Sequence, residues 1–121
     1  MKLISELCQN HNGDIDLLRT MICDSALNGA DICKIQSIKA ESLTHRDEYE
    51  SFRKYDSEYK RFKELELSYD DEKLFIETCN ENNIIPMTTI FSTSHYDYFN
   101  SLNYDYLKLS FTEVYWDNDI Q

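Results

Sequence analysis

The sequence predicts an α/β fold with parallel strands, because its opening segment reads as a strand, a helix and a second strand. Residues 2–8 alternate as a strand does, residues 14–28 carry apolar side chains at helical spacing, and residues 31–36 form a second apolar strand. Two strands joined through a helix run parallel, with a right-handed crossover. At 121 residues the chain can bury the core of one domain.

The first helix has clear start and stop signals. Asn12-Gly13 predicts a tight turn, and Asp14 is a good N-cap because its carboxylate can accept free backbone N–H groups of the first turn. Gly29 is well placed just after the helix, where a left-handed backbone is common. The apolar positions expected to face the core are Ile15, Leu18, Ile22 and Ala26.

The middle of the chain predicts a long polar connection followed by two helices. Residues 37–57 are charged and show no sustained period, whereas residues 58–65 can form a short helix. Ser68 and Asp71 have the spacing of a capping box, and they open a helix that ends at Asn82-Asn83. The predicted apolar face of this helix consists of Leu74, Phe75, Thr78 and Cys79.

The last part of the chain predicts two more strands around a helix. Residues 84–91 read as the third strand, residues 94–102 as a helix capped by Thr93 or Ser94, and residues 104–109 as the fourth strand. Residues 112–121 are acidic and aromatic, and they either begin another helix or fray.

Composition excludes several classes of function. The net charge of −11 argues against a general nucleic-acid or anionic-membrane binder, which needs a basic surface. Four cysteines, at positions 8, 23, 33 and 79, form no CxxC pair and lie in apolar segments, which is typical of buried thiols in a reducing cytoplasm. The sequence shows no signal-peptide core and no run of membrane-spanning length, so we expect a soluble protein.

Alternation along the strands predicts one shared polar face. Side chains two residues apart on a strand point to the same side, so on the first strand Ile4, Glu6 and Cys8 share a face. In a closed parallel barrel one face of every strand meets the barrel axis, and functional groups gather at the carboxyl ends of the strands. The side chains that can converge there are Glu6, Lys34, Gln36, Thr89, Lys108 and Ser110, although Thr88 is as polar as Thr89.

Each candidate also has a plainer interpretation. Strand lysines are most often exposed, and Gln36 and Thr89 are residue types that commonly serve as strand-end hydrogen bonders. His11, between two asparagines in a turn, most often fixes such a loop. His45 and His95 lack a second ligand at metal spacing, so no metal site is predicted within the chain.

Several separated motifs resemble the sialic acid synthase family, which includes the legionaminic and pseudaminic acid synthases. Residues 5–14, SELCQNHNGD, are similar to the family's first strand, approximately AExGxNHNGD. Residues 29–43 are similar to its second, approximately GADAVKFQTFKAEDL, residues 88–91 to its STPF strand end and residues 108–113 to its KIxSGE strand. The resemblance implies a partial TIM-type (β/α)8 barrel, with residues 1–121 as its N-terminal half and about four βα units.

The resemblance also implies a reaction and roles for residues. The family condenses phosphoenolpyruvate with an N-acylated amino sugar, giving a nonulosonic acid. By likeness, Glu6 would position or activate the sugar, Lys34 and Lys108 would bind phosphoenolpyruvate, and Gln36 and Thr89 would line the same pocket. Phe111 stands where the family has a phosphate-binding serine, so Ser110 or Thr112 would have to substitute for it.

The same resemblance sets expectations for what this chain would lack. The family uses a divalent metal, manganese or magnesium, and its metal-binding histidines lie beyond the fourth strand, so the ligands are not expected in this chain. The C-terminal half barrel and an antifreeze-like domain are likewise expected to be absent. Cys8 stands where the family usually has glycine, and Ile90 where it has proline.

Two other interpretations remain open from the sequence. One is a shortened, non-catalytic paralogue that acts as a binding or assembly module and docks through its open sheet edges. The other is a different barrel lyase or aldolase that acts on phosphorylated keto acids. For the synthase interpretation, too, we expect a homo-oligomer or a partner chain to cover the open edges of the barrel.

Overall fold

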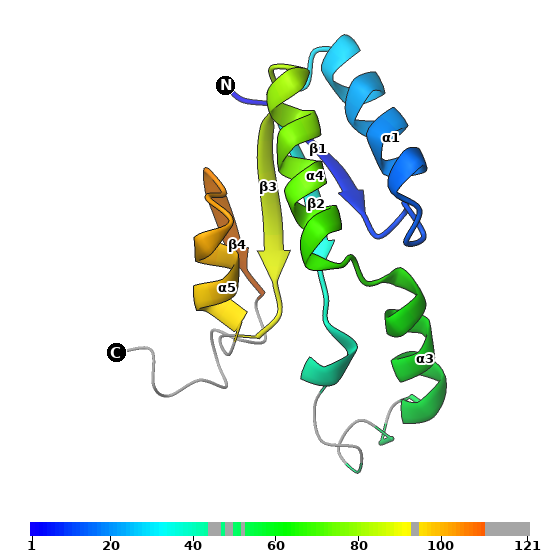
Figure 1. The fold of residues 1–121 in the computed structure, drawn as a ribbon. Helices are drawn as coiled ribbons and strands as arrows, with labels where there is room; N and C mark the ends of the chain where they lie inside the picture. The colour runs from blue at the N-terminus through cyan, green and yellow to red at the C-terminus, as the bar shows by residue number, and fades with distance from the viewer. Residues whose placement is uncertain (44–46, 48–49, 52, 93–94, 111–121) are drawn as a thin grey trace.

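The computed structural model describes residues 1–43, 47, 50–51, 53–92 and 95–110, which form one four-stranded sheet with helices on one side. The strands follow the order β1-β2-β3-β4, and all neighbouring pairs are parallel. Figure 1 shows α1, α4 and α5 in front of this sheet. The strands are β1 (Ile4–Cys8), β2 (Ile32–Ser37), β3 (Ile85–Ile90) and β4 (Tyr106–Leu109). The helices are α1 (Ile15–Leu27), η1 (Ala40–Ser42), α3 (Tyr55–Leu65), α4 (Tyr69–Glu81) and α5 (Tyr96–Ser101).

The predicted signals at the ends of α1 and α4 are confirmed. The Asp14 side chain accepts the backbone N–H groups of Asp16 and Leu17 at 2.9 and 3.1 Å. Gly29 follows the C-cap of α1 with φ +87°, a conformation that glycine adopts at little cost. At the start of α4 both bonds of the Ser68–Asp71 capping box are present.

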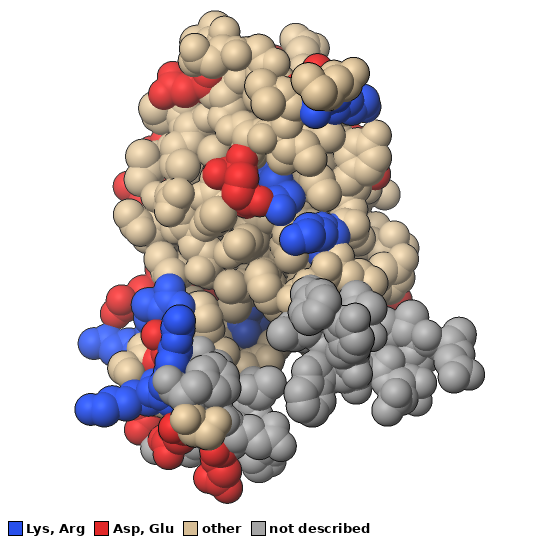
Figure 2. Space-filling view, turned by 180° about the vertical axis from the view of Figure 1, so that it is seen from behind, with Lys and Arg blue, Asp and Glu red and all other residues tan. Residues whose placement is uncertain are grey.

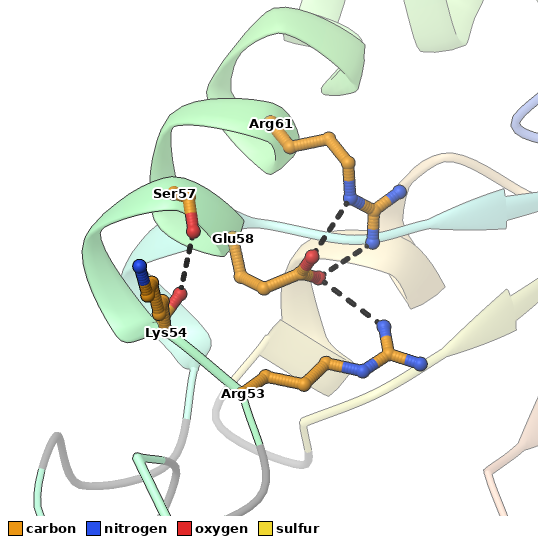
Figure 3. Close-up of polar contacts among 5 residues, drawn as sticks. All are labelled: Arg53, Lys54, Ser57, Glu58 and Arg61. Atoms are coloured by element: carbon orange, nitrogen blue, oxygen red, sulfur yellow. Dashed lines mark hydrogen bonds and ion pairs between the residues drawn. The ribbon is translucent and has the colours of Figure 1, made fainter.

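Helix α3 begins at Tyr55, earlier than the predicted Glu58. Its first turn is acidic, which suits the positive end of a helix, and Ser57 Oγ donates to the Lys54 carbonyl at 3.0 Å. Figure 3 shows Arg53 and Arg61 reaching the Glu58 carboxylate from two directions, with N–O distances of 3.5 and 2.8 Å. These local contacts extend the helix beyond the apolar pattern that the sequence offered.

Helix α5 and strand β4 are shorter than predicted. α5 begins at Tyr96, and its N-cap is His95, without a capping bond from the side chain. The expected caps, Thr93 and Ser94, lie outside the described residues, as do residues 112–121. The strand predicted from residue 104 starts at Tyr106.

The hydrophobic core lies between the sheet and its helices. One cluster joins β1 and β2 to α1 and α4, and its fully buried members include Leu18, Ile22, Cys33, Ile35 and Phe75. A smaller cluster of Ile90, Phe99 and Leu102 packs α5 against β3. Within the described ranges, none of the helices combines the length and apolar character that crossing a membrane requires.

Candidate active site

The strand register places most of the predicted site residues in two adjacent rows. Glu6 pairs with Lys34 across β1 and β2, and Gln36, Thr89 and Lys108 pair with one another across β2, β3 and β4. Gln36 follows Lys34 by two residues, so both rows lie on the same face. This face is the one opposite the helices, because Cys33 and Ile35 belong to the core on the helix side.

One detail of the predicted alternation is wrong. A bulge in β1 shifts the register after Glu6, so Cys8 lies opposite Ile35 and not opposite Gln36. Cys8 has φ 52°, a left-handed conformation that is uncommon for a residue with a Cβ. Cys8 therefore does not continue the face of Glu6 as expected.

Glu6 and Lys34 form an ion pair that joins the middle of β1 to the middle of β2. The Lys34 side chain is 11% exposed, whereas that of Glu6 is 37% exposed. The bulge also turns the Cys8 backbone N–H toward Glu6, where it donates to Oε1 at 3.1 Å. Figure 2 shows the helix-free face, on which an acidic group touches a basic one amid largely uncharged surface.

Thr89 is the threonine that faces the site. The residue is 3% exposed, and its hydroxyl has no hydrogen-bond partner in the described part of the chain. Thr88 points to the helix side, where its Oγ1 lies 2.6 Å from Ser37 Oγ. A buried hydroxyl without a partner is costly, so Thr89 is the site residue that would gain most from a ligand.

Lys108 and Ser110 extend the row at the β4 edge. Lys108 is exposed, and its ammonium group forms no hydrogen bond or ion pair with the described residues. Ser110 is 8% exposed, and its backbone N–H donates to the Ile90 carbonyl at 3.1 Å. The structure thus brings Lys34 into a pair with Glu6, but leaves Lys108 open to solvent on the same face. Phe111 and Thr112 lie outside the described residues.

His11 has the loop-fixing role that is common for a turn histidine. It is fully buried, and its Nδ1 accepts the Gly13 backbone N–H at 3.0 Å, while Nε2 has no partner among the described residues. Burial lowers the pKa of His11, although the nearby Asp71 charge acts in the opposite direction. His11 is therefore a neutral structural residue of the β1–α1 turn.

A hollow between η1, α4 and α5 contains a lysine that already has partners within the protein. It is lined by Lys39, Glu41, Glu66, Tyr69, His95 and Tyr98. The Lys39 ammonium donates to the Leu67 carbonyl and lies 5.7 Å from the centre of the Tyr98 ring. Because its cation is already satisfied, this hollow is a weaker candidate than the helix-free face.

A buried acidic cluster was missed by the sequence interpretation. Glu72, on α4, is 1% exposed and accepts hydrogen bonds from Ser37 Oγ at 2.6 Å and from the Tyr104 hydroxyl. Leu74 was expected at this inner face but is only partly buried. The signal was present, since Glu72 lies three residues before Phe75, on the apolar side of the helix. We call Glu72, Ser37, Thr88 and Tyr104 the Glu72 cluster.

The described residues offer no group of three or more histidine, cysteine or acidic side chains that could hold a metal ion. Glu6 is an oxygen ligand of the right kind, but its carboxylate is taken up by Lys34 and the Cys8 N–H. The described part of the site therefore does not fit a resident divalent metal by itself.

Comparison with known proteins gives two relatives that share one name. The chain is 33% identical over 118 residues to N,N′-diacetyllegionaminic acid synthase of Legionella pneumophila, covering 93% of this chain and 33% of that protein. It is 28% identical to the protein of the same name from Campylobacter jejuni, covering 93% of this chain and 35% of the relative. The chain thus spans about a third of the length of these relatives.

Solved structures show the same fold. The crystal structure of N-acetylneuraminic acid synthetase from Leptospira borgpetersenii matches with a TM-score of 0.74 and 24% identity, covering 88% of this chain and 35% of that one. The Bacillus subtilis spore coat polysaccharide biosynthesis protein spsE matches with a TM-score of 0.67 and 21% identity, covering 89% of this chain and 28% of that one. Both matches support the partial TIM-type barrel. The NeuB family model matches residues 21–121, and this chain therefore belongs to the NeuB family.

Proposed function

We propose that this chain supplies the phosphoenolpyruvate-binding half of a synthase site that makes nonulosonic, sialic-type acids. The observation that carries the proposal is the row of Gln36, Thr89 and Lys108 beside the Glu6–Lys34 pair. These groups share the helix-free face near the carboxyl ends of parallel strands, where barrels of this type carry their chemistry. Among the described residues the buried Thr89 hydroxyl has no hydrogen-bond partner, and the Lys108 ammonium is exposed, so both groups are open to an anionic ligand.

The chemistry of the proposed substrates fits these groups. Carbon 3 of phosphoenolpyruvate attacks the aldehyde carbon of the open-chain amino sugar, which forms the new C–C bond and makes the aldehyde oxygen an alkoxide that takes up a proton. Water then adds at carbon 2, and phosphate leaves from the resulting tetrahedral intermediate. Lys108 and Lys34 would hold the phosphate and carboxylate throughout, because fixed cations in a partly dry site stabilise anionic groups strongly. Glu6 would accept a hydrogen bond from the sugar.

A divalent metal, manganese or magnesium, would polarise the sugar aldehyde in such a reaction. Its ligands would have to come from outside the described residues, so none of the roles assigned to Glu6, Lys34 and Lys108 depends on it. The expected setting is the cytoplasm, where phosphoenolpyruvate and free cysteine thiols both occur.

Calorimetric titration of the chain with phosphoenolpyruvate tests the proposal. We expect binding that is lost in Lys34→Ala and in Lys108→Ala, and that persists in Lys60→Ala, which removes a lysine whose side chain is 80% exposed on α3. A folded chain that binds no phosphoenolpyruvate, or equal losses in all three variants, would contradict the proposal.

The exposed sheet edges favour one second candidate, a binding or assembly module. Leu3 and Ile4 at the β1 edge are 57% and 45% exposed, and Tyr106 and Leu109 at the β4 edge are 42% and 37% exposed. Such apolar edges are suited to association with another copy or another chain. Sedimentation velocity would distinguish this candidate, which predicts a concentration-dependent larger species in a chain that does not bind phosphoenolpyruvate.

A further inference from the structure

The Glu72 cluster lies directly behind the proposed ligand-binding row, on the other side of the sheet. Ser37 Oγ donates to Glu72 Oε1 at 2.6 Å and lies 2.6 Å from Thr88 Oγ1. The Tyr104 hydroxyl donates to the second Glu72 oxygen. Glu72 is 1% exposed and Thr88 is fully buried. The cluster therefore joins β2, β3, α4 and the segment that leads into β4 by hydrogen bonds that are buried, except that of Tyr104, which is part-buried.

Members of this cluster are chain neighbours of the site residues. Ser37 follows Gln36 on β2, and Thr88 precedes Thr89 on β3. Gln36 and Thr89 are direct register partners, whereas Ser37 and Thr88 contact each other diagonally, because Ser37 pairs with Ile90 and Thr88 with Ile35. A one-residue slip would move every side chain of a strand to the other face. The diagonal bond on the helix side therefore forms only in the register that pairs Gln36 with Thr89 on the site side.

We propose that the Glu72 cluster is a positioning device that sets the alignment of Gln36 and Thr89 for the anionic ligand. Glu72 acts through Ser37 and Thr88 and does not touch the ligand itself. Tyr104 ties the same carboxylate to the start of β4, and so to the strand that carries Lys108. The ligand part of this inference rests on the proposed function, but the alignment of Gln36 and Thr89 can be measured without any ligand.

The protonation state of Glu72 offers a way to test the positioning role, because a purely structural packing contact would not change with pH. An ionised carboxylate accepts from both Ser37 and Tyr104, whereas a protonated one must donate from one oxygen, so one neighbouring hydroxyl has to turn. Burial raises the pKa of Glu72, and the two hydroxyl donors oppose that rise. The other charged or titratable groups that face it are Lys39 after β2, Asp71 on α4 and Tyr98 on α5.

The experiment is a pH titration of the full chain followed by nuclear magnetic resonance. We expect the Gln36 side-chain amide and the Thr89 methyl signals to shift with the same midpoint as the Glu72 carboxyl carbon. In Glu72→Gln this shared midpoint should disappear, while the spectrum should remain that of a folded protein. If Glu72→Gln fails to fold, Tyr104→Phe removes one hydroxyl donor and should move the midpoint upward. If the Gln36 and Thr89 signals do not shift as Glu72 titrates, the inference is overturned.

A matched pair of variants tests the ligand part. Thr88→Val removes the cluster hydroxyl, whereas Thr78→Val removes a hydroxyl at 4% exposure whose bond stays within α4, to the Leu74 carbonyl at 2.7 Å. We expect Thr88→Val to weaken phosphoenolpyruvate binding about threefold to tenfold and Thr78→Val by less than about twofold. Equal effects would count against a positioning role. If the parent chain binds no phosphoenolpyruvate, the proposed function fails, and the titration still decides the alignment.

Discussion

The Glu6–Lys34 pair leads to an asymmetric prediction, because its two members differ in exposure. Glu6→Gln leaves the Lys34 ammonium at 11% exposure without its carboxylate, whereas Lys34→Met leaves a Glu6 carboxylate that is 37% exposed and still bonded to the Cys8 N–H. A stranded buried charge is expensive, while a stranded charge that water can reach is not. Glu6→Gln should therefore be the more damaging change.

The expected magnitudes follow from the usual energetics of such pairs in proteins. Breaking a fully buried pair costs about 3–5 kcal/mol, and because both members of this pair keep some contact with water, we expect Glu6→Gln to lower the free energy of unfolding by about 2–3 kcal/mol. Lys34→Met should cost about 1 kcal/mol or less, since the methionine fills the same space without a charge. The double variant should resemble Lys34→Met, because neither charge then remains.

Urea unfolding at neutral pH measures these differences, provided that the slope of each transition is unchanged. The control pair is Lys60–Glu64 on α3, whose side chains are 80% and 66% exposed at an N–O distance of 3.9 Å. Lys60→Met and Glu64→Gln should each change the free energy of unfolding by about 0.5 kcal/mol or less. If Lys34→Met costs as much as Glu6→Gln, the assignment of Lys34 as the desolvated member is wrong.

Three further predictions concern the β1–α1 turn and the end of α1. Cys8→Gly should raise the free energy of unfolding by about 0.5–1 kcal/mol, because glycine adopts φ 52° more easily than cysteine does. A lower free energy of unfolding in chemical denaturation would contradict this. Gly13→Ala should lower the unfolding temperature more than Gly29→Ala. An added Cβ at Gly13 would lie 2.4 Å from the Glu64 carbonyl oxygen, whereas at Gly29 no heavy atom lies within 4 Å. Equal losses in the two variants would refute the close contact at Gly13. The lowered pKa of His11 means that the imidazole binds a proton less tightly in the folded chain than in the unfolded chain. The free energy of unfolding should therefore fall as pH drops from the ordinary histidine range toward the folded pKa. In His11→Asn this dependence of the free energy of unfolding on pH should be weaker.

The sequence was sufficient for the element order and for most of the site face. Two-residue alternation depends only on strand geometry, so Lys34, Gln36 and Lys108 could be assigned to one face before the fold was known. Alternation could not decide whether Thr88 or Thr89 faces the site, because both side chains are polar and no other residue of the strand indicates which face is buried. The choice required the register with Gln36, which the structure supplies.

Other features were not predicted from the sequence. The bulge at Cys8 has no signal in this chain's own residues, because positive φ is normally marked by glycine or asparagine. The glycine that the resembled family usually has at this position was the one indication of it. Glu72 was overlooked since an acidic residue in a helix is read as solvent-facing unless its partners on other strands are known. The exposure of Lys108 depends on which segments cover the β4 edge, and local sequence carries no information about that.

The separation between the two faces of the sheet bears on how the protein could diversify. Side chains that hold the helices in place occupy one set of strand positions, and side chains that would meet a ligand occupy the other. A library of variants confined to the helix-free strand positions could therefore change what that face binds while the apolar interior is preserved. The Ser37–Thr88 contact is the exception, since it couples the two sets, and these two hydroxyls should be held constant in such a search.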